Sequence, residues 1–113
     1  MKDVNKVILV GRLGEDPSHK TTANGGSLTR FSVATSYPKR SDSLGEAQVE
    51  TTWHSVVTWG KRADACRDFL RKGSSVYVEG TLKKSKFEGR DGIERVSVEI
   101  VADDISFLGK KAS

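Results

Sequence analysis

Residues 49–80 read VETTWHSVVTWGKRADACRDFLRKGSSVYVEG, and the apolar pattern within them changes period twice. Residues 49–59 are rich in β-branched and aromatic side chains and predict a strand. Residues 61–72 have apolar residues at helical spacing and predict a helix. Residues 75–87 predict another strand, in which Gly80 marks a bend or a bulge. The stretch therefore predicts one helix inserted between two strands.

The predicted helix has a single apolar stripe and a marked end. Its apolar stripe consists of Ala63, Cys66, Phe69 and Leu70. Gly73 is expected as the residue just beyond the last turn, because glycine adopts positive φ without strain. Arg71 and Lys72 fall in that last turn, where the helix dipole favours cations.

The rest of the chain alternates between turns and strand-like segments. Asp16-Pro17 and Asn24-Gly25-Gly26 are typical of a loop and a turn, because Pro fixes φ and Asn-Gly tolerates positive φ. Residues 37–48 hold Pro38, Gly45 and many polar side chains, and predict a long mobile hairpin loop. The other predicted segments are strands at 4–12, 28–36 and 93–101, a hairpin tip at 88–92, and a short further pairing segment at 105–108.

These segments give the order strand, strand, strand, helix, strand, strand. Five strands with one helix between the third and the fourth is the layout of the OB-fold, a small all-β Greek-key barrel that often binds oligonucleotides. A length of 113 residues fits one domain. We expect that domain to span residues 1–109 and to be followed by a short basic tail at 110–113.

The composition favours a globular protein with an anionic partner. Hydrophobic residues make up 35% of the chain and charged residues 30%, and the net charge is +4. No apolar run approaches the length of roughly 18 residues that a membrane helix needs. The N-terminus lacks the apolar segment of a signal peptide, and Cys66 is the single cysteine, so no internal disulfide can form. We expect a cytoplasmic protein.

Enzymatic chemistry has little support in the sequence. His19, His54 and Cys66 are not spaced as zinc ligands. Residues 11–14, Gly-Arg-Leu-Gly, lack the ending of a phosphate-binding loop and do not match a dinucleotide fingerprint. We expect no catalytic residue, no metal and no cofactor.

The two tryptophans share one face of the strand at 49–59. Trp53 and Trp59 lie six residues apart, or about 20 Å at roughly 3.3 Å per residue. Each base has a π-face, so exposed indoles can stack on bases without choosing among them. The alternative is that both indoles belong to the core. Ser55 between them and Lys61 beyond them favour the exposed platform.

Residues 81–90 form a basic segment with one aromatic side chain, Phe87. These ten residues contain four cationic side chains and one anionic side chain, that of Glu88. A hairpin arm of this kind suits a flexible polyanion that carries bases. A solvated edge strand explains the same charges, because Lys guards sheet edges against pairing. The segment by itself leaves both interpretations open.

The residues in order resemble the bacterial single-stranded DNA-binding protein family, commonly called SSB. No single motif is unique, but the ordered set is specific and covers about residues 4–109. The matching segments are VNKVILVG at 4–11, NGG at 24–26, FSVAT at 31–35, TWH at 52–54, GK at 60–61, LRKGS at 70–74 and VYVEG at 76–80.

The resemblance implies an OB-fold homotetramer over which single-stranded DNA wraps. It places base stacking on Trp53, Trp59 and Phe87, and phosphate contacts on Lys61, Arg71, Lys72, Lys83 and Lys86. A further aromatic stacking position of some members falls near Lys39, so that stack is lost unless Tyr37 substitutes. Tyr37, Lys39, Lys84 and Arg90 are therefore additional candidate DNA contacts. His54 matches a position near the subunit interface.

The end of the chain departs from the family pattern. Family members usually continue into a Gly/Pro/Gln-rich linker and an acidic tip that recruits replication and repair enzymes, whereas this sequence ends in KKAS at 110–113. We expect no recruitment through such a tip, whether the sequence is a truncated form or a tailless paralogue.

The sequence thus favours coating and protection of single-stranded DNA in replication, recombination and repair. A protein-interaction adaptor of the primosomal type shares the fold and is the alternative from another class. Binding of single-stranded RNA is a third possibility, because no clear device for reading a 2′-hydroxyl is present and the preference for DNA rests on the resemblance.

Overall fold

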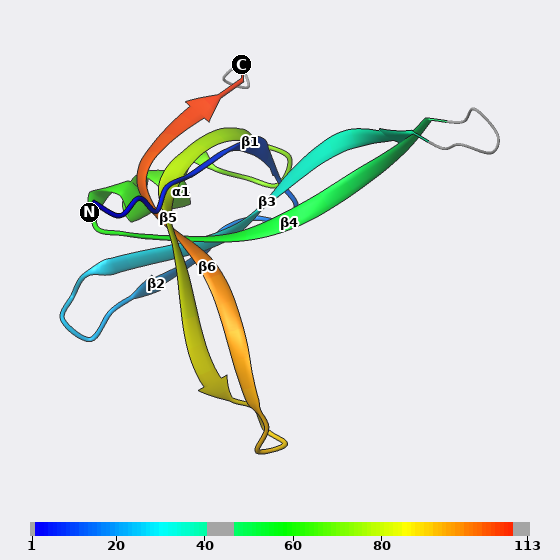
Figure 1. The fold of residues 1–113 in the computed structure, drawn as a ribbon. Helices are drawn as coiled ribbons and strands as arrows, with labels where there is room; N and C mark the ends of the chain where they lie inside the picture. The colour runs from blue at the N-terminus through cyan, green and yellow to red at the C-terminus, as the bar shows by residue number, and fades with distance from the viewer. Residues whose placement is uncertain (1, 41–46, 110–113) are drawn as a thin grey trace.

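The described residues form six strands and one helix (Figure 1). The computed structural model describes residues 2–40 and 47–109. The elements in chain order are β1 (Val7–Leu13), β2 (Ser18–Thr21), β3 (Ser27–Arg40), β4 (Ala47–Trp59), α1 (Lys61–Phe69), β5 (Ser75–Glu88) and β6 (Glu94–Leu108).

Five of the strands close into a barrel. The strand order is β1-β5-β6-β4-β3-β2, and β1 also pairs with β3 through Arg12↔Ala34 and Leu13↔Val33. This pairing closes the ring and leaves β2 attached to the side of β3. The predicted five-stranded OB-fold, with its helix between the third and fourth barrel strands, is confirmed.

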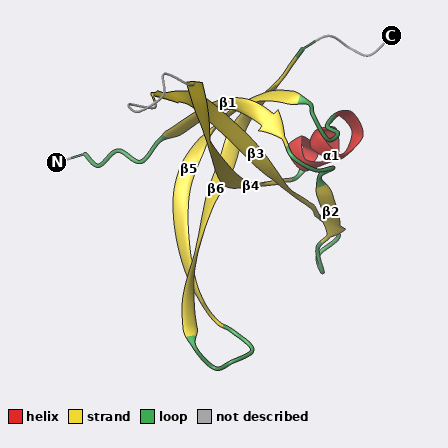
Figure 2. Ribbon diagram, turned by 90° about the vertical axis from the view of Figure 1, so that its right-hand side faces the viewer, coloured by secondary structure: helices red, strands yellow, loops and turns green. Residues whose placement is uncertain are grey.

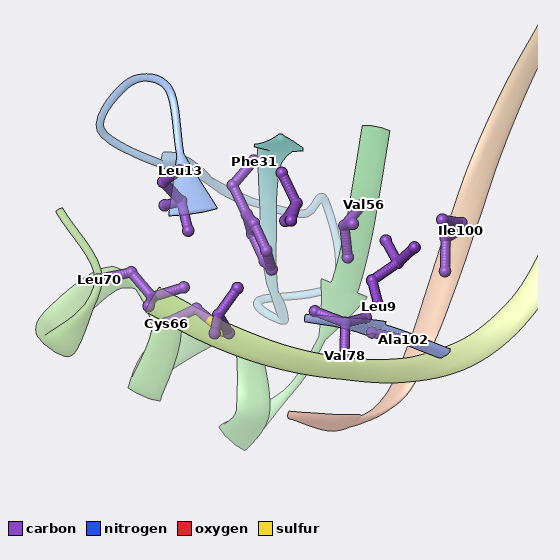
Figure 3. Packing of buried hydrophobic residues seen from close by; sticks show 11 residues of the cluster. Leu9, Leu13, Phe31, Val56, Cys66, Leu70, Val78, Ile100 and Ala102 are labelled. Carbon is purple, nitrogen blue, oxygen red and sulfur yellow. The ribbon is translucent and has the colours of Figure 1, made fainter. Parts of the chain in front are cut away.

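The core follows the alternation of the strands. Phe31 and Val33 on β3 and Val56 on β4 point inward, and Figure 3 shows the cluster that they form with the helix residues Cys66 and Leu70. The helix is attached to β3 by Thr29 Oγ1, which donates a hydrogen bond of 2.8 Å to the carbonyl oxygen of Ala63. The helix therefore closes the barrel interior and leaves the outer faces of the strands free.

Two glycines allow the strands to approach closely. A Cβ atom at Gly11 would overlap the carbonyl oxygen of Ala34, and one at Gly80 would overlap that of Val101. The register between β5 and β6 shifts at Glu79/Gly80, which confirms the bulge predicted at Gly80.

The two hairpins are longer than predicted. Pairing between β3 and β4 continues to Arg40↔Ala47, so the loop predicted at 37–48 is wrong for residues 37–40 and 47–48, and 41–46 lie outside the described residues. Pro38 pairs opposite Val49 in a part of β3 that has β4 as its sole described neighbour. A two-stranded ribbon leaves half of its N–H groups unpaired, and proline is tolerated there.

The other strand boundaries also differ from the prediction. β1 begins at Val7 and not at residue 4, because the Asn5 side chain bonds both the N–H and the carbonyl of Leu82 in place of a backbone ladder. β2 was not predicted, although Asn24-Gly25 is a hairpin signal that implies a strand on each side. β6 continues without a break to Leu108, where it pairs with Ser75, so the segment at 105–108 does pair.

The helix is shorter than predicted and ends at Phe69. Leu70 is extended and buried, so its side chain draws the backbone out of the helix and into the core. Arg71 therefore lies beyond the last turn, where its Nη1 donates to the carbonyl oxygens of Arg67 and Leu70. Phe69 is 64% exposed and does not belong to the buried stripe, and its ring lies 5.7 Å from that of Phe107.

Candidate nucleic-acid interface

Both tryptophans lie on the outer face of β4. Trp53 is 60% exposed and Trp59 is 43% exposed, so neither indole is part of the core. Val56 points into the barrel between them, and the alternation of the strand therefore turns both indoles outward. Small side chains face this part of β4, since Ala34 is opposite Trp53 and Ser32 is opposite Ser55. The exposed indoles are thus available to a ligand that lies along the strand.

A pocket opens beside Trp53. It has a volume of about 350 Å³ and is lined by Gly14, Glu15, Ser32 and Trp53. Gly14 allows the indole to approach the chain closely, because a Cβ atom there would overlap the Cζ3 and Cη2 atoms of its six-membered ring. The pocket is open to solvent and has one flat aromatic wall, which suits a stacked base.

The β5–β6 hairpin extends beyond the barrel as an arm (Figures 1 and 2). Cross-strand partners share a face, so Phe87 shares one with Arg95, and Lys83 shares that face with Glu99. Lys84 opposite Val98 and Lys86 opposite Val96 occupy the other face. The basic residues predicted as one group are thus divided between the two faces of the arm.

The face of the arm that carries Phe87 continues the indole face. Ile100 is buried and pairs with Val56, so its neighbour Glu99 points outward, as Val57 does. Glu99 is opposite Lys83, and Phe87 follows on the same face. Phe87 is 48% exposed. We call this continuous surface, which runs from Trp53 and Trp59 to Lys83 and Phe87, the aromatic track.

Lys86 and Lys84 lie off the aromatic track. Lys86 Nζ lies 3.5 Å from the Glu94 carboxylate, in a pair so exposed that it contributes little to stability. Beside these lysines the same face of the arm exposes the apolar side chains Leu82, Val96 and Val98. A single strand would reach Lys86 only by passing over this second face.

The predicted phosphate contacts around α1, which are Lys61, Arg71 and Lys72, lie at its start and beyond its end. Lys61 begins the helix immediately after Trp59 and Gly60, at the exposed end of the indole platform. Arg71 is partly engaged, because its guanidinium caps helix carbonyl oxygens. The backbone N–H of Lys72 donates to Asp16 at 2.8 Å, and its side chain is exposed. The structure therefore brings Lys61 next to an indole but gives Arg71 a structural contact.

Tyr37 and Lys39 lie on the face of the β3–β4 ribbon opposite Trp53. Trp53 is paired with Ala34, so the even-numbered residues of β3 point to the same face as Trp53. Tyr37, which is paired with Glu50, is odd-numbered and points to the other face. The Tyr37 hydroxyl donates to Glu50 at 2.8 Å, and this hydrogen bond raises the pKa of Tyr37. Tyr37 is therefore not placed to add a ring beside Trp53.

His54 and Arg90 both lie off the aromatic track, for different reasons. His54 is half-buried on the inward face of β4, with its Nε2 2.8 Å from Thr35 Oγ1. Arg90 lies in the tip between β5 and β6 and is exposed. Asp91 holds this tip, because it accepts hydrogen bonds from the Ile93 N–H and from Arg95 Nη2.

Within residues 2–40 and 47–109, no cluster of His, Cys, Asp and Glu could hold a metal ion. Burial raises the pKa of Cys66 to about 11, so its thiol is protonated at neutral pH. Among the described helices, none has the length and apolar character to cross a membrane.

Sequence reasoning missed several residues of this surface. Arg30, Glu99 and Arg95 lie on it, and Gly14 and Glu15 line its pocket. Alternation along β3 does turn Arg30 and Ser32 to one face, but only the register between strands brings them beside the indoles.

A closed five-stranded barrel with one helix between its third and fourth strands defines an OB-fold protein. Residues 4–108 match the model of the single-strand binding protein family, and the chain belongs to this family.

Relatives and a solved structure agree with this assignment. A single-stranded DNA-binding protein of Xanthomonas campestris pv. campestris is 48% identical over 108 residues, which are 96% of this chain and 62% of the relative. A protein of the same name from Xylella fastidiosa is 45% identical over 111 residues, covering 98% of this chain and 67% of the relative. The chain thus spans about three fifths to two thirds of these proteins' length. The structure described as Plasmodium falciparum SSB complex with ssDNA aligns with a TM-score of 0.86 at 32% identity, covering 96% of this chain and 98% of that chain.

Proposed function

We propose that this protein binds single-stranded DNA without sequence preference, and coats and protects exposed strands in replication, recombination and repair. The observation that carries the proposal is the aromatic track, on which three exposed rings and Lys83 share one continuous face of an OB-fold barrel. Rings stack on any base, and cations neutralise phosphates, so neither contact selects a sequence. Membership of the single-strand binding protein family supports the same function. The bacterial relatives support a site of action in the bacterial cytoplasm, at the nucleoid.

Residues 1–109 would act as one binding domain, by stacking on Trp53, Trp59 and Phe87 and without catalysis, metal or cofactor. Lys61 and Lys83 are the phosphate contacts best supported by position, since both lie beside exposed rings or on the same face. Lys72, Lys84, Lys86 and Arg90 remain candidates for a strand that continues beyond the aromatic track, whereas Arg71 is already engaged in a helix cap.

Titration with poly-dT at increasing salt tests this function. We expect strong quenching of tryptophan fluorescence and an affinity that falls with salt, with a log–log slope of about −0.7 per phosphate neutralised. Matched RNA and duplex DNA oligonucleotides are the controls. Equal or tighter binding of RNA would replace DNA by RNA as the ligand. No binding to any single strand, together with binding to a replication helicase, would favour the adaptor.

We further propose that the protein assembles as a homotetramer. Ile8 and Val10 are more than half exposed on the outer face of β1. In the described part of the chain β1 pairs with β3 only at Arg12 and Leu13, so the edge of residues 7–10 has no strand partner. Exposed apolar side chains next to a free strand edge favour association with another copy.

Analytical ultracentrifugation at micromolar concentration tests the assembly. We expect a tetramer, and we expect Ile8→Lys to shift it toward smaller species. Val49→Lys is the control, because Val49 is exposed on the β3–β4 ribbon, away from β1. A stable wild-type monomer would contradict the tetramer, and a dimer would favour the adaptor.

A further inference from the structure

One ion pair crosses the outer face of β4 in the middle of the aromatic track. Arg30 on β3 is paired with Val57 on β4, and Val57 is paired with Val101 on β6. Arg30 Nε donates a hydrogen bond of 2.9 Å to Glu99 Oε2 on β6. The bond therefore spans β4, and Val57 is buried although it points outward.

The pair lies where a bound strand would cross from the indoles to the arm. Along β4, Val57 lies between Trp53 and Trp59 on the same face. Toward β5, Glu99 is opposite Lys83, which leads to Phe87. An unpaired carboxylate at this crossing would repel each phosphate that passed it, so the partner of Glu99 matters for binding.

The guanidinium of Arg30 keeps donors available. Its Nε is bonded to Glu99. Neither of its Nη nitrogens has a hydrogen-bond partner among residues 2–40 and 47–109. The Arg30 side chain is 46% exposed, whereas that of Glu99 is 22% exposed. A planar guanidinium that is held through one nitrogen presents the others in a fixed fork, which matches two phosphate oxygens.

We propose that Arg30 contacts a backbone phosphate at this crossing and that Glu99 is its positioning residue. This inference rests on the proposed binding of single-stranded DNA. Glu99 fixes the plane of the guanidinium, so that the Nη fork is already oriented when the strand arrives. Less side-chain entropy is then lost on binding than with a free arginine.

The direction in which one substitution changes DNA affinity separates this positioning role from simple neutralisation of charge. Glu99→Gln removes a negative charge from the path of a polyanion. If Glu99 only neutralised Arg30, the change would strengthen binding. If Glu99 positions Arg30, the change weakens binding even though the protein becomes more positive.

A double-mutant cycle with a labelled oligo-dT measures this coupling. The proteins are the wild type, Glu99→Gln, Arg30→Gln and the double variant, each titrated well below its melting temperature. We expect Glu99→Gln to lower affinity about fivefold in the wild type, roughly the worth of one ordinary hydrogen bond. In the Arg30→Gln background the same change should raise affinity or leave it unaltered. Arg30→Gln should reduce the salt slope by about 0.7.

Two controls complete the cycle. Glu94→Gln makes the same charge change on the other face of the arm, beside Lys86, and should raise affinity slightly. Arg30→Lys retains the charge but not the fork, and should lower affinity while retaining the salt slope.

The outcomes distinguish the two proposals. Wild-type protein that does not bind oligo-dT would overturn the proposed function and this inference with it. Wild-type binding together with a Glu99→Gln variant that binds more tightly would overturn the inference alone. Equal effects of Glu99→Gln in both backgrounds would do the same.

Discussion

At the scale of single residues, the position of the Trp53 indole depends on the absence of a side chain at Gly14. The indole lies over the Gly14 backbone and forms one wall of an open pocket. The far edge of an exposed side chain can move aside at little cost, whereas a backbone carbonyl in a barrel wall cannot. Gly14 and Gly11 differ in this respect, because the carbonyl oxygen of Ala34 lies over Gly11.

This contrast gives a matched pair of substitutions. Gly14→Ala should displace the indole and lower affinity for single-stranded DNA by up to about 1–3 kcal/mol, the worth of one stacked base. Its melting temperature should change little. Gly11→Ala should cost roughly 1–3 kcal/mol of folding stability by overpacking. Thermal melts and oligo-dT titrations on both variants test this, and the prediction fails if Gly14→Ala binds as the wild type does.

At the scale of elements, the β5–β6 arm has two faces of different chemistry. Lys83 and Phe87 share one, and Lys84 and Lys86 share the other with exposed apolar residues. Adjacent residues of a strand point to opposite sides, so a run of lysines in sequence is not a run in space.

Lys83 and Lys84 therefore form a matched test of the aromatic track. Each alanine variant loses one positive charge at nearly the same place on the arm. Lys83→Ala should lower affinity for all sequences alike and reduce the salt slope by about 0.7, and Lys84→Ala should change the slope less. Equal losses in the two variants would mean that the strand wraps both faces of the arm.

We expect acid to weaken the tip of the arm. The N–H of Ile93 and the guanidinium of Arg95 lower the pKa of Asp91 below its ordinary value of 3.8, the backbone hydrogen bond having the larger effect. A lowered folded-state pKa means that the carboxylate stabilises the tip above about pH 3.8, and that this stabilisation is lost as the pH falls through the lower value.

NMR of the Ile93 amide proton should report this loss. Its chemical shift should titrate below pH 3.8, and its exchange with solvent should accelerate there. Asp91→Asn should abolish the titration. A midpoint above pH 3.8 would show that the carboxylate is not stabilised by the tip.

At the scale of the whole molecule, the barrel was predictable because its determinants are local. Period-two alternation identified the barrel strands, and the apolar stripe identified the helix. The missed features depend on partners distant in sequence. The Asn5 side chain replaces a backbone ladder only because Leu82 lies beside it. Arg30 and Glu99 come together only because their strands, β3 and β6, pair with opposite edges of β4.

The same limit applies to the candidate site. The spacing of Trp53 and Trp59 was sufficient to place both on one face. Alternation also separates Lys83 from Lys84 and Lys86, but only the pairing of β4 with β6 and of β6 with β5 shows which of these lysines lies on the face of the indoles. The end of α1 was misplaced because burial of Leu70 outweighed a helical pattern that continues to Lys72.

The central claim is that the exposed indoles hold bases and do not hold the fold together. The measurement that tests it most directly is the poly-dT affinity of Trp53→Ala and Trp59→Ala, taken with their melting temperatures. Each variant should lose roughly 1–3 kcal/mol of binding free energy and melt within a few degrees of the wild type. A loss of roughly 3–5 kcal/mol of stability, as expected for a buried aromatic, together with normal DNA binding by the folded protein, would contradict it.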